Sequence, residues 1–340
     1  MSALSTDQII SYARRHGGYD SAASLAVTRA HGDQDEQRFR ISAPEARTLT
    51  LKVYAPPAME SARREIAGLS LAQALGIGPA LAYADEVGAE LGGPALLLEE
   101  PAGVALGDSR MSAEDARDWL FLLLTLHHLP ADGVTVASSM SPDAATWWQR
   151  SQPAWTECRA LYAEDRFRPL LDALAQLHAI VGVHVDVNRG LWERVARRPC
   201  HGNPAPAHLV RVEKRLTLVE WNGFGLGDPA MEVGRAAALA ALSGELSAEQ
   251  YVRFIADYLA GMRDGKDSAL EERLRVFASI LPLGFCFVML RVLAQSQTRG
   301  EEYARGVEQV SRALIWIQDT LGVVVGSPAE LLAPLRVAVG

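Results

Sequence analysis

Two loops in the second half of the chain carry polar side chains of types that can handle a phosphoryl group. The first holds His201, Asn203 and His208, and the second holds Glu220 at the end of a strand predicted over 216–219. Paired strands fix where their loops begin, so these side chains are expected to lie a few ångströms apart. This construction is typical of a phosphoryl-transfer site, which depends on positioning and charge neutralisation.

The same two loops carry a motif. Its pattern resembles that of the aminoglycoside phosphotransferase and choline kinase family, which reads His-Gly-Asp, an Asn five residues after that Asp, Ile-Asp-Trp and then Gly-Asp-Pro. The positions that match are His201, Gly202, Pro206, Trp221, Gly227, Asp228 and Pro229. The resemblance implies an α+β, protein-kinase-like two-lobe fold, with a β-rich N-lobe over 1–102 and a mainly α-helical C-lobe over 103–340. It also implies that Asp228 braces the loop carrying the catalytic groups.

Three positions depart from the family pattern. Asn203 stands where the family has its base Asp, His208 where it has a metal-binding Asn, and Glu220 where it has a metal-binding Asp. An amide has no basic lone pair, and losing a general base costs about 10²- to 10⁴-fold in rate. Mg²⁺ prefers hard oxygen ligands, so His208 is a poor substitute. The extra methylene of Glu220 shifts its oxygens, and about 1 Å of misplacement can cost about 100-fold.

A second pair of residues fits the nucleotide side of such a site. Lys52 lies in a strand predicted over 48–54, and Glu65 lies in a helix predicted over 59–75. In protein kinases the Lys of the third strand holds the α and β phosphates of ATP and pairs with a Glu on the next helix. We therefore predict that Lys52 and Glu65 anchor a nucleotide. Glu60 is a rival partner, and a surface lysine with a solvated glutamate is the alternative interpretation.

Two further segments have weaker assignments. By position, Glu99 and Pro101 resemble the hinge whose backbone meets an adenine ring in this family. Gly17, Gly18 and Ser21 are candidates for a phosphate-covering turn, but a plain helix C-cap at Gly17 explains them equally well.

The remaining elements follow from hydrophobic periodicity and capping residues. Strands are expected over 24–29, 38–42, 48–54, 80–84 and 95–99, and helices over 59–75, 112–128, 233–242, 248–263, 269–299 with a break at Pro282, and 301–321. The aromatic-rich segment 142–199 is predicted to be helical, and its aromatics are interpreted as core or as a wall of a substrate pocket. His178, His184 and Asp186 are assigned to a loop between helices rather than to a metal site.

Composition limits the classes of partner. The net charge of −8 argues against sequence-independent binding of nucleic acid, which requires Lys and Arg on phosphates. The longest apolar run, 276–290, is shorter than the roughly 20 residues that span a bilayer and contains Pro282, which favours a buried helix over a membrane segment. Three scattered cysteines and an N-terminus without a signal-peptide pattern predict a cytoplasmic protein.

Three functional hypotheses follow. The leading one is a pseudokinase that binds a nucleotide or small molecule in the cleft between lobes, with ATP as a candidate cofactor and a doubtful role for Mg²⁺ or Mn²⁺; a protein partner stays open. The second is an active ATP-dependent O-phosphotransferase for a small hydroxylated metabolite or antibiotic, with Glu220 as the main metal ligand. The third is a different chemistry in the same cleft that uses His201 or His208 as acid or base.

Overall fold

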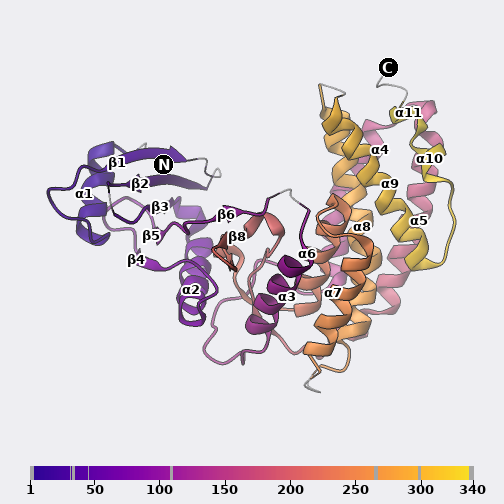
Figure 1. Cartoon of the computed structure of the whole chain (residues 1–340). Helices are drawn as coiled ribbons and strands as arrows, with labels where there is room; N and C mark the ends of the chain where they lie inside the picture. Colours follow the sequence, from indigo (N-terminus) through magenta and orange to yellow (C-terminus); the bar gives the residue numbers. More distant parts are fainter. Residues whose placement is uncertain are drawn as a thin grey trace. The chain divides into compact units, whose positions relative to one another are not determined.

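The structure is a computed structural model with two compact units. Unit 1 comprises Met1–Gly107, Thr125–Ser139 and Arg198–Leu226, and unit 2 comprises Asp108–Leu124, Met140–Arg197 and Gly227–Gly340. The residues that the structure describes are 4–30, 32, 35–44, 46–107, 110–263, 267–297 and 300–336. Strands dominate the N-terminal region and helices the C-terminal region, as predicted (Figure 1).

Unit 1 is built on a five-stranded antiparallel sheet with the order β1-β2-β3-β5-β4. Its strands are β1 (Ala26–Ala30), β2 (Glu36–Ser42), β3 (Leu49–Tyr54), β4 (Leu81–Asp85) and β5 (Ala95–Glu99). In β2 the apolar residues Phe39 and Ile41 are buried on one face, and the charged residues alternate with them. Alternation with a period of two sends these two sets to opposite faces, so one face of the sheet is core and the other can carry a site.

Helix α1 (Thr6–His16) packs on the apolar face of this sheet. Ser5 caps its N-terminus through a capping box with Gln8, and Gly17 is its C-cap, so the C-cap interpretation of Gly17 is confirmed. Ile9, Tyr12 and further α1 residues join one hydrophobic cluster with the buried residues of β2, β3 and β5. This packing fixes which face of each strand points away from the core.

Helix α2 (Met59–Leu75) has the predicted bounds and follows a short 3-10 turn, η1 (Pro56–Ala58). It buries Glu65 together with Ile66, Gly68 and Leu69. A Cβ at Gly68 would lie 2.8 Å from the ring of Phe224, so α2 approaches the segment after β9 closely.

The predicted loops of unit 1 lie between short strands. The short elements around these loops are, in chain order, β6 (Val104–Ala105), β7 (Arg198–Cys200), η4 (Pro206–His208), β8 (Leu209–Val212), β9 (Arg215–Leu218), η5 (Trp221–Gly223) and β10 (Gly225–Gly227). Strands β6, β8 and β9 form one sheet and β7 pairs with β10. The predicted turn around Lys214 is present, with Glu213 at φ 54°.

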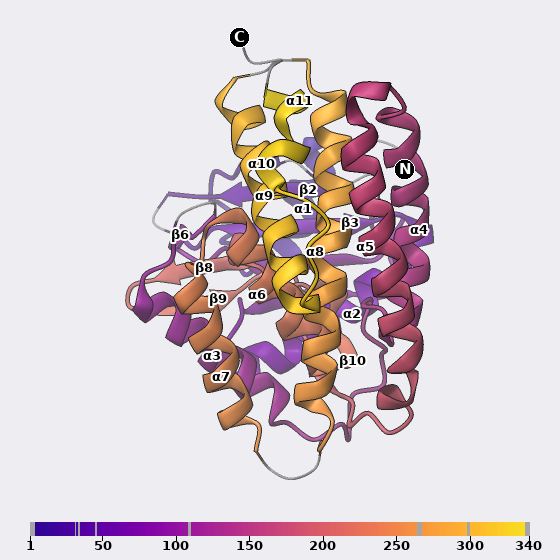
Figure 2. The ribbon, with the colours of Figure 1, turned by 90° about the vertical axis from the view of Figure 1, so that its right-hand side faces the viewer.

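Unit 2 is helical. Its helices are α3 (Ala113–His127, whose last residues belong to unit 1), α4 (Ala144–Leu161), α5 (Arg168–Val187), α6 (Pro229–Ser243), α7 (Ala248–Gly261), α8 (Leu270–Gln295), α9 (Glu301–Leu321), α10 (Pro328–Leu331) and α11 (Ala333–Arg336), with 3-10 turns η2 (Asp165–Phe167) and η3 (Arg189–Trp192). Helix α8 packs against α4, α5, α6 and α9 (Figures 1 and 2). It is the core helix of this unit.

Two predictions for unit 2 are wrong. His178, His184 and Asp186 lie inside α5, not in a loop, and α8 continues through Pro282 without the predicted break. Proline removes one backbone hydrogen bond from a helix. The apolar residues on both sides of Pro282 are buried, so tertiary packing outweighs that local cost.

The aromatic residues of α4 and α5 pack in the interior of unit 2. Trp155 is buried and lies 5.1 Å from the ring of Phe287. His178 Nε2 donates a hydrogen bond to Gln152 Oε1 at 2.9 Å, and the His178 ring centroid lies 4.5 Å from that of Trp148. Of the two interpretations open from the sequence, these contacts favour core.

By length and composition alone, Asp165–Val187 and Leu270–Gln295 could cross a membrane. Core helices of soluble proteins pass the same test. Of the apolar window in α8, 67% is buried inside the protein, in agreement with the predicted buried helix.

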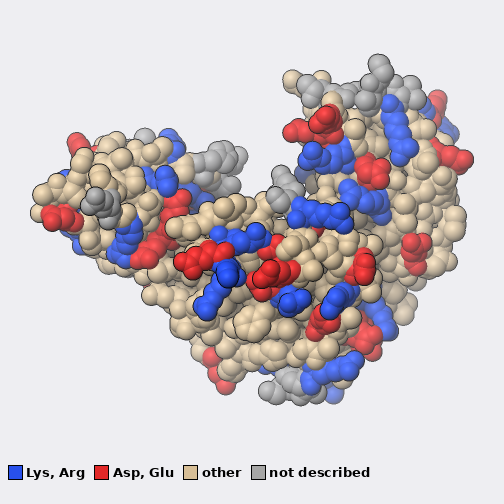
Figure 3. Space-filling model, in the orientation of Figure 1, with Lys and Arg blue, Asp and Glu red and all other residues tan. Residues whose placement is uncertain are grey.

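Charged side chains of both signs are interspersed on the face that Figure 3 shows. Exposed ion pairs join Arg168 to Asp165 at 2.7 Å and Arg189 to Asp186 at 2.8 Å, at the two ends of α5. Such exposed pairs contribute about 0–1 kcal/mol each.

We expect Gly284→Ala in α8 to destabilise unit 2. A Cβ there would lie 2.2 Å from the Trp147 ring, and overpacking of a core typically costs about 1–3 kcal/mol. Gly182→Ala in α5 is the matched control, because its Cβ would meet Trp148 at an ordinary 3.6 Å. Thermal unfolding should show a lower midpoint for the first variant and an unchanged or higher midpoint for the second; equal midpoints would contradict the packing.

Candidate functional site

The ion pair predicted from the sequence is formed. Lys52 Nζ on β3 donates to Glu65 Oε1 on α2 at 2.7 Å, and the two side chains are only 2% and 1% exposed. The Tyr54 hydroxyl donates to the other oxygen of Glu65. The rival Glu60 is 58% exposed and lies near Arg63 and Arg64. Glu65 is therefore the partner of Lys52.

Arg38 on β2 adds a second cation beside Lys52. The two residues are direct partners in the β2–β3 register, so their side chains leave the same face of the sheet. Arg38 Nη1 and Nη2 donate to the two carboxylate oxygens of Glu220 at 2.7 and 2.9 Å. Lys52 Nζ also donates to Glu220 Oε2 at 2.9 Å. Glu220 is thus held by a two-pronged guanidinium contact and an ammonium.

The loop that contains His201 is braced internally. His201 is fully buried; its Nε2 donates to the Val219 carbonyl at 2.9 Å and its Nδ1 accepts from the Asn203 N–H at 3.3 Å. His208 Nδ1 donates to the Asn203 carbonyl at 2.7 Å. The Asn203 amide side chain, which is half-buried, has no hydrogen-bond partner among the described residues.

Gly202 brings the two loops into contact. Its φ is 94°, and a Cβ at this position would lie 2.3 Å from the carbonyl oxygen of Gly223. Only glycine fits a left-handed position with so close a backbone. The His201 ring also lies 4.5 Å from the ring of Trp221. The second loop is therefore packed directly against the first.

Asp228 has a bracing position within unit 2. It caps α6 by accepting from the Ala230 N–H at 2.9 Å, and its two oxygens accept from Arg273 at 3.0 Å each. Trp192 Nε1 donates to it at 3.0 Å. Since Asp228 is buried and these donors take both oxygens, its geometry is that of a structural residue.

A cavity of about 290 Å³ lies beside the Lys52–Glu65 pair, within unit 1. Its walls come from β1, β2, β3, α2, the end of β5 and the segment after β9, and include Arg38, Arg40, Lys52, Leu69, Glu99, Glu100, Pro101 and Glu220. This volume is at the lower end of the roughly 300–1,000 Å³ of ligand pockets.

The predicted hinge forms one wall of this cavity. The N–H groups of Glu99 and Glu100 already donate to the carbonyls of Ala80 and Thr48, at 2.9 and 3.0 Å, and Pro101 has no N–H. The side chains of Glu99 and Glu100 pair with Arg47 and Arg40. Residues 99–101 therefore offer no free backbone donor to a ligand, and the Pro101 carbonyl already accepts from the Gly103 N–H at 2.9 Å.

A comparison of sequences decides the family. The profile of the phosphotransferase enzyme family, APH, matches residues 26–271, which is more than half of the chain. The chain belongs to this family. No curated protein sequence matches it.

Solved structures confirm the protein-kinase-like fold. Choline kinase from Cryptosporidium parvum has a TM-score of 0.61 at 11% identity, with 94% of this chain and 97% of that chain covered. Choline kinase LicA from Streptococcus pneumoniae has 0.54 at 15%, with 92% and 100% covered. The streptomycin–ATP complex of APH(2″)-IIa has 0.51 at 13%, with 95% and 100% covered. At these identities the likeness shows the fold alone.

The residues at the phosphotransferase family's metal positions do not fit Mg²⁺ or Mn²⁺. Both oxygens of Glu220 accept from cationic nitrogens, and Nδ1 of His208 is used within its loop. Among the described residues, no group of three potential metal ligands includes Glu220 or His208. A divalent ion here would have to displace Arg38 and meet the positive charge of Lys52.

The electrostatics of Glu220 agree with this. Burial alone would raise its pKa, but Lys52 and Arg38 outweigh burial and lower the pKa of Glu220 to about 2. Burial would likewise lower the pKa of Lys52, and Glu65 and Glu220 outweigh it, so the pKa of Lys52 is above its usual value. Lys52 and Glu220 are both charged at neutral pH, and they neutralise each other.

Arg38 is the site residue that sequence reasoning missed. Its signal is the alternation in β2, where Glu36, Arg38 and Arg40 occupy every second position opposite Phe39 and Ile41. Alternation assigns Arg38 to the face opposite the core. That the same face carries Lys52 depends on the register of β2 with β3.

The contacts of the Glu220 carboxylate with Arg38 and Lys52 form the Glu220 clamp, and this clamp should make the stability of the fold depend on pH. Its pKa is lower in the folded protein than the ordinary 4.5, so the ionised carboxylate stabilises the fold above pH 4.5, by about 3 kcal/mol. This contribution is lost as the pH falls from 4.5 toward 2. Glu220→Gln should therefore be less stable than the wild type at about pH 6, and the difference should shrink at about pH 3. Unfolding midpoints that differ equally at both pH values would contradict the clamp.

We expect Lys52→Met to destabilise the protein, because it leaves Glu65 buried without its main cation. Removing one partner of a buried ion pair costs about 3–5 kcal/mol. Lys52→Met combined with Glu65→Gln should recover part of this loss, since glutamine is neutral and still accepts from Tyr54. A double-mutant cycle on unfolding midpoints measures the coupling, and strictly additive effects would contradict the pair.

Proposed function

We propose that this phosphotransferase-family protein is a binding protein with lost or strongly impaired phosphoryl transfer, and that its unit 1 cavity takes a small ligand of low charge without a metal ion. A nucleoside or nucleoside monophosphate is the first candidate ligand. The observation that carries the proposal is the clamp of Arg38 on Glu220, since it places a protein cation on the carboxylate at the family's metal position.

The charge of the cavity supports a ligand of low charge. Three cations, Arg38, Arg40 and Lys52, and four carboxylates, Glu65, Glu99, Glu100 and Glu220, line it, so the formal charge is 3 − 4 = −1. Each cation is already paired with a carboxylate. A triphosphate would have to break these pairs, and a buried carboxylate that loses its partner costs several kcal/mol.

The loop residues support impaired transfer. Asn203 stands at the family's base position and can orient a hydroxyl by hydrogen bonding, but it cannot take its proton. Phosphoryl transfer depends on neutralising charge on the phosphate oxygens, usually by metal ions. Here the candidate metal carboxylate is neutralised by the protein. Both ring nitrogens of His201 are engaged in its loop, which favours a bracing role over acid–base chemistry.

The relatives support the class of ligand. The Streptococcus pneumoniae choline kinase LicA has been solved with AMP, and APH(2″)-IIa with streptomycin and ATP. In this chain the hinge offers no free backbone N–H group, which favours a ligand that donates there, such as the exocyclic amine of adenine.

One observation favours a second candidate. The Lys52–Glu65 pair is retained with full burial, as an active ATP-dependent O-phosphotransferase would need. Under this alternative Glu220 would leave Arg38 to bind metal, Glu220→Ala would abolish turnover, and Asn203→Asp would raise it.

Titrations of adenosine, AMP and ATP, each with Mg²⁺ and with a chelator, separate the two candidates. We expect adenosine and AMP to bind at least as tightly as ATP, and Mg²⁺ to leave the affinities unchanged. Thermal shift reads this directly, because a ligand that binds only the native state stabilises it by about 2.7 kcal/mol at a hundredfold excess over its Kd. ADP release, measured in parallel, should stay at the background rate.

Arg38→Ala tests whether the contact of Arg38 with Glu220 is what prevents Mg²⁺ from binding. It frees Glu220, so we expect Mg²⁺ to strengthen ATP binding in this variant only. Arg29→Ala is the matched control, because Arg29 is an exposed arginine on the neighbouring strand and does not line the cavity. Mg²⁺-dependent binding of ATP by the wild type, or ADP release that Glu220→Ala abolishes, would overturn the proposal in favour of the active enzyme.

A further inference from the structure

Unit 2 contains a larger cavity that the nucleotide-type site does not use. Its volume is about 680 Å³, and it is lined by the C-terminal end of α6, the start of α7 and one face of α9. Helix α6 has 15 residues, so this cavity lies roughly 22 Å along that helix from Asp228 at its other end. The volume is within the roughly 300–1,000 Å³ of pockets that bind small molecules.

One part of the cavity is aromatic and apolar. Tyr251 on α7 and Trp316 on α9 meet edge to face, with ring centroids 4.5 Å apart. Val252 and Ile315 flank them and are 66% and 48% exposed, although both are large and apolar. Burial raises the pKa of Tyr251 to about 12, so this wall carries no charge at neutral pH.

Another part is cationic. Arg312 on α9 reaches Gly244 at the end of α6, where a Cβ would lie 2.9 Å from its Nη1. The Nε of Arg312 is buried without a hydrogen-bond partner. Within the part of the chain that the structure describes, neither Arg312 nor Arg110, which also lines the cavity, forms an ion pair with a carboxylate.

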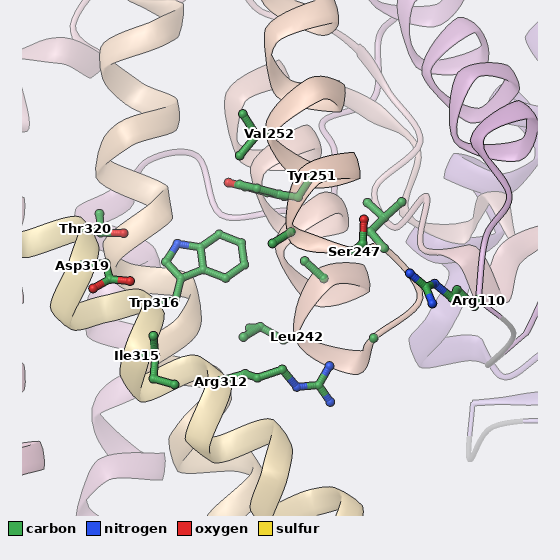
Figure 4. A pocket seen from close by; sticks show the side chains of 14 residues that line it. Arg110, Leu242, Ser247, Tyr251, Val252, Arg312, Ile315, Trp316, Asp319 and Thr320 are labelled. Atoms are coloured by element: carbon green, nitrogen blue, oxygen red, sulfur yellow. The ribbon is translucent and has the colours of Figure 1, made fainter. Parts of the chain in front are cut away.

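The cationic and the acidic side chains of this cavity lie on opposite sides of Trp316. In Figure 4 the guanidinium groups of Arg110 and Arg312 lie to the right of the Trp316 ring, whereas Asp319 and Thr320 lie to its left. Arg312 and Asp319 are seven residues apart on α9, which corresponds to about 10 Å along the helix. Asp319 therefore does not pair with Arg312, and the guanidinium of Arg312 is available to a ligand.

We propose that this cavity binds a small amphipathic anion, namely an aromatic carboxylate whose ring contacts Trp316 and Tyr251 and whose carboxylate is held by Arg312. Guanidinium groups bind carboxylates in a two-pronged geometry, and aromatic side chains supply large contact areas at low entropy cost. The ligand would give Arg312 the carboxylate partner that it lacks among the described residues, and it would cover the exposed apolar rim. The proposal is independent of the proposed function of unit 1.

Binding of naphthalene-2-carboxylate, followed by ligand-observed NMR, tests the proposal. We expect saturable binding that is weaker for 2-naphthylmethanol and weakest for 2-naphthylmethylamine. Arg312→Met should lower the affinity about tenfold to a hundredfold, as expected for loss of a charged hydrogen-bond partner. Arg305→Met, at an exposed arginine on the same helix, should leave it unchanged, as should Arg38→Ala in unit 1.

Two substitutions at the exposed rim of the cavity test the proposal even if Arg312→Met does not fold. Val252 is exposed, so Val252→Glu and Val252→Lys should both fold. The first should weaken naphthalene-2-carboxylate binding and the second should preserve or strengthen it. The absence of saturable binding up to the solubility of the probe, equal binding of the alcohol, tighter binding of the amine, or equal affinities for the two Val252 variants would each overturn the proposal.

Discussion

Four buried or half-buried charges in unit 1 must neutralise one another, and much of the surrounding structure serves that requirement. Lys52 and Glu65 are almost fully removed from water, and a charge in such a place is tolerated only when paired and hydrogen-bonded. The β2–β3 register sets Arg38 beside Lys52, and α2 presents Glu65. Glu220 reaches both cations from a left-handed backbone at φ 64°, a conformation that costs a non-glycine residue about 1–3 kcal/mol.

The network also bears on the proposal that phosphoryl transfer is impaired. In a phosphotransferase with a metal centre, carboxylates remain partly unneutralised until the ion binds, and the ion then neutralises the phosphates. In this chain Arg38 supplies that positive charge permanently, from a side chain fixed by Glu36 and Glu220. The folded protein thus gains stability from the groups that a catalyst would keep for its metal. The proposed absence of a basic carboxylate at the position of Asn203 points in the same direction, because positioning without proton transfer suffices for binding.

The fold and half of this network could be predicted from the sequence. Lys52 and Glu65 lie in elements whose bounds were predicted closely, since α2 was predicted over 59–75 as observed and β3 was predicted over 48–54 and is observed at Leu49–Tyr54. Arg38 could not be assigned, since its partner Glu220 is 182 residues away and only the three-dimensional structure joins them. The predictions of a loop at His184 and a helix break at Pro282 were wrong for another reason. Their local signals favour a loop and a break, but burial of the neighbouring apolar residues keeps both segments helical.

The two cavities obey the same electrostatic rule with opposite results. An arginine whose guanidinium is partly removed from water loses hydration, and the loss is offset only by an acceptor. In unit 1 every cation lining the cavity has an internal carboxylate, so a ligand gains little from bringing further negative charge. In unit 2 Arg312 keeps a buried Nε without an acceptor, next to an aromatic wall that is partly open to water. A ligand that brings both an acceptor and an apolar surface removes both costs at once, which is why charge disfavours a triphosphate in the unit 1 cavity and favours a carboxylate in the unit 2 cavity.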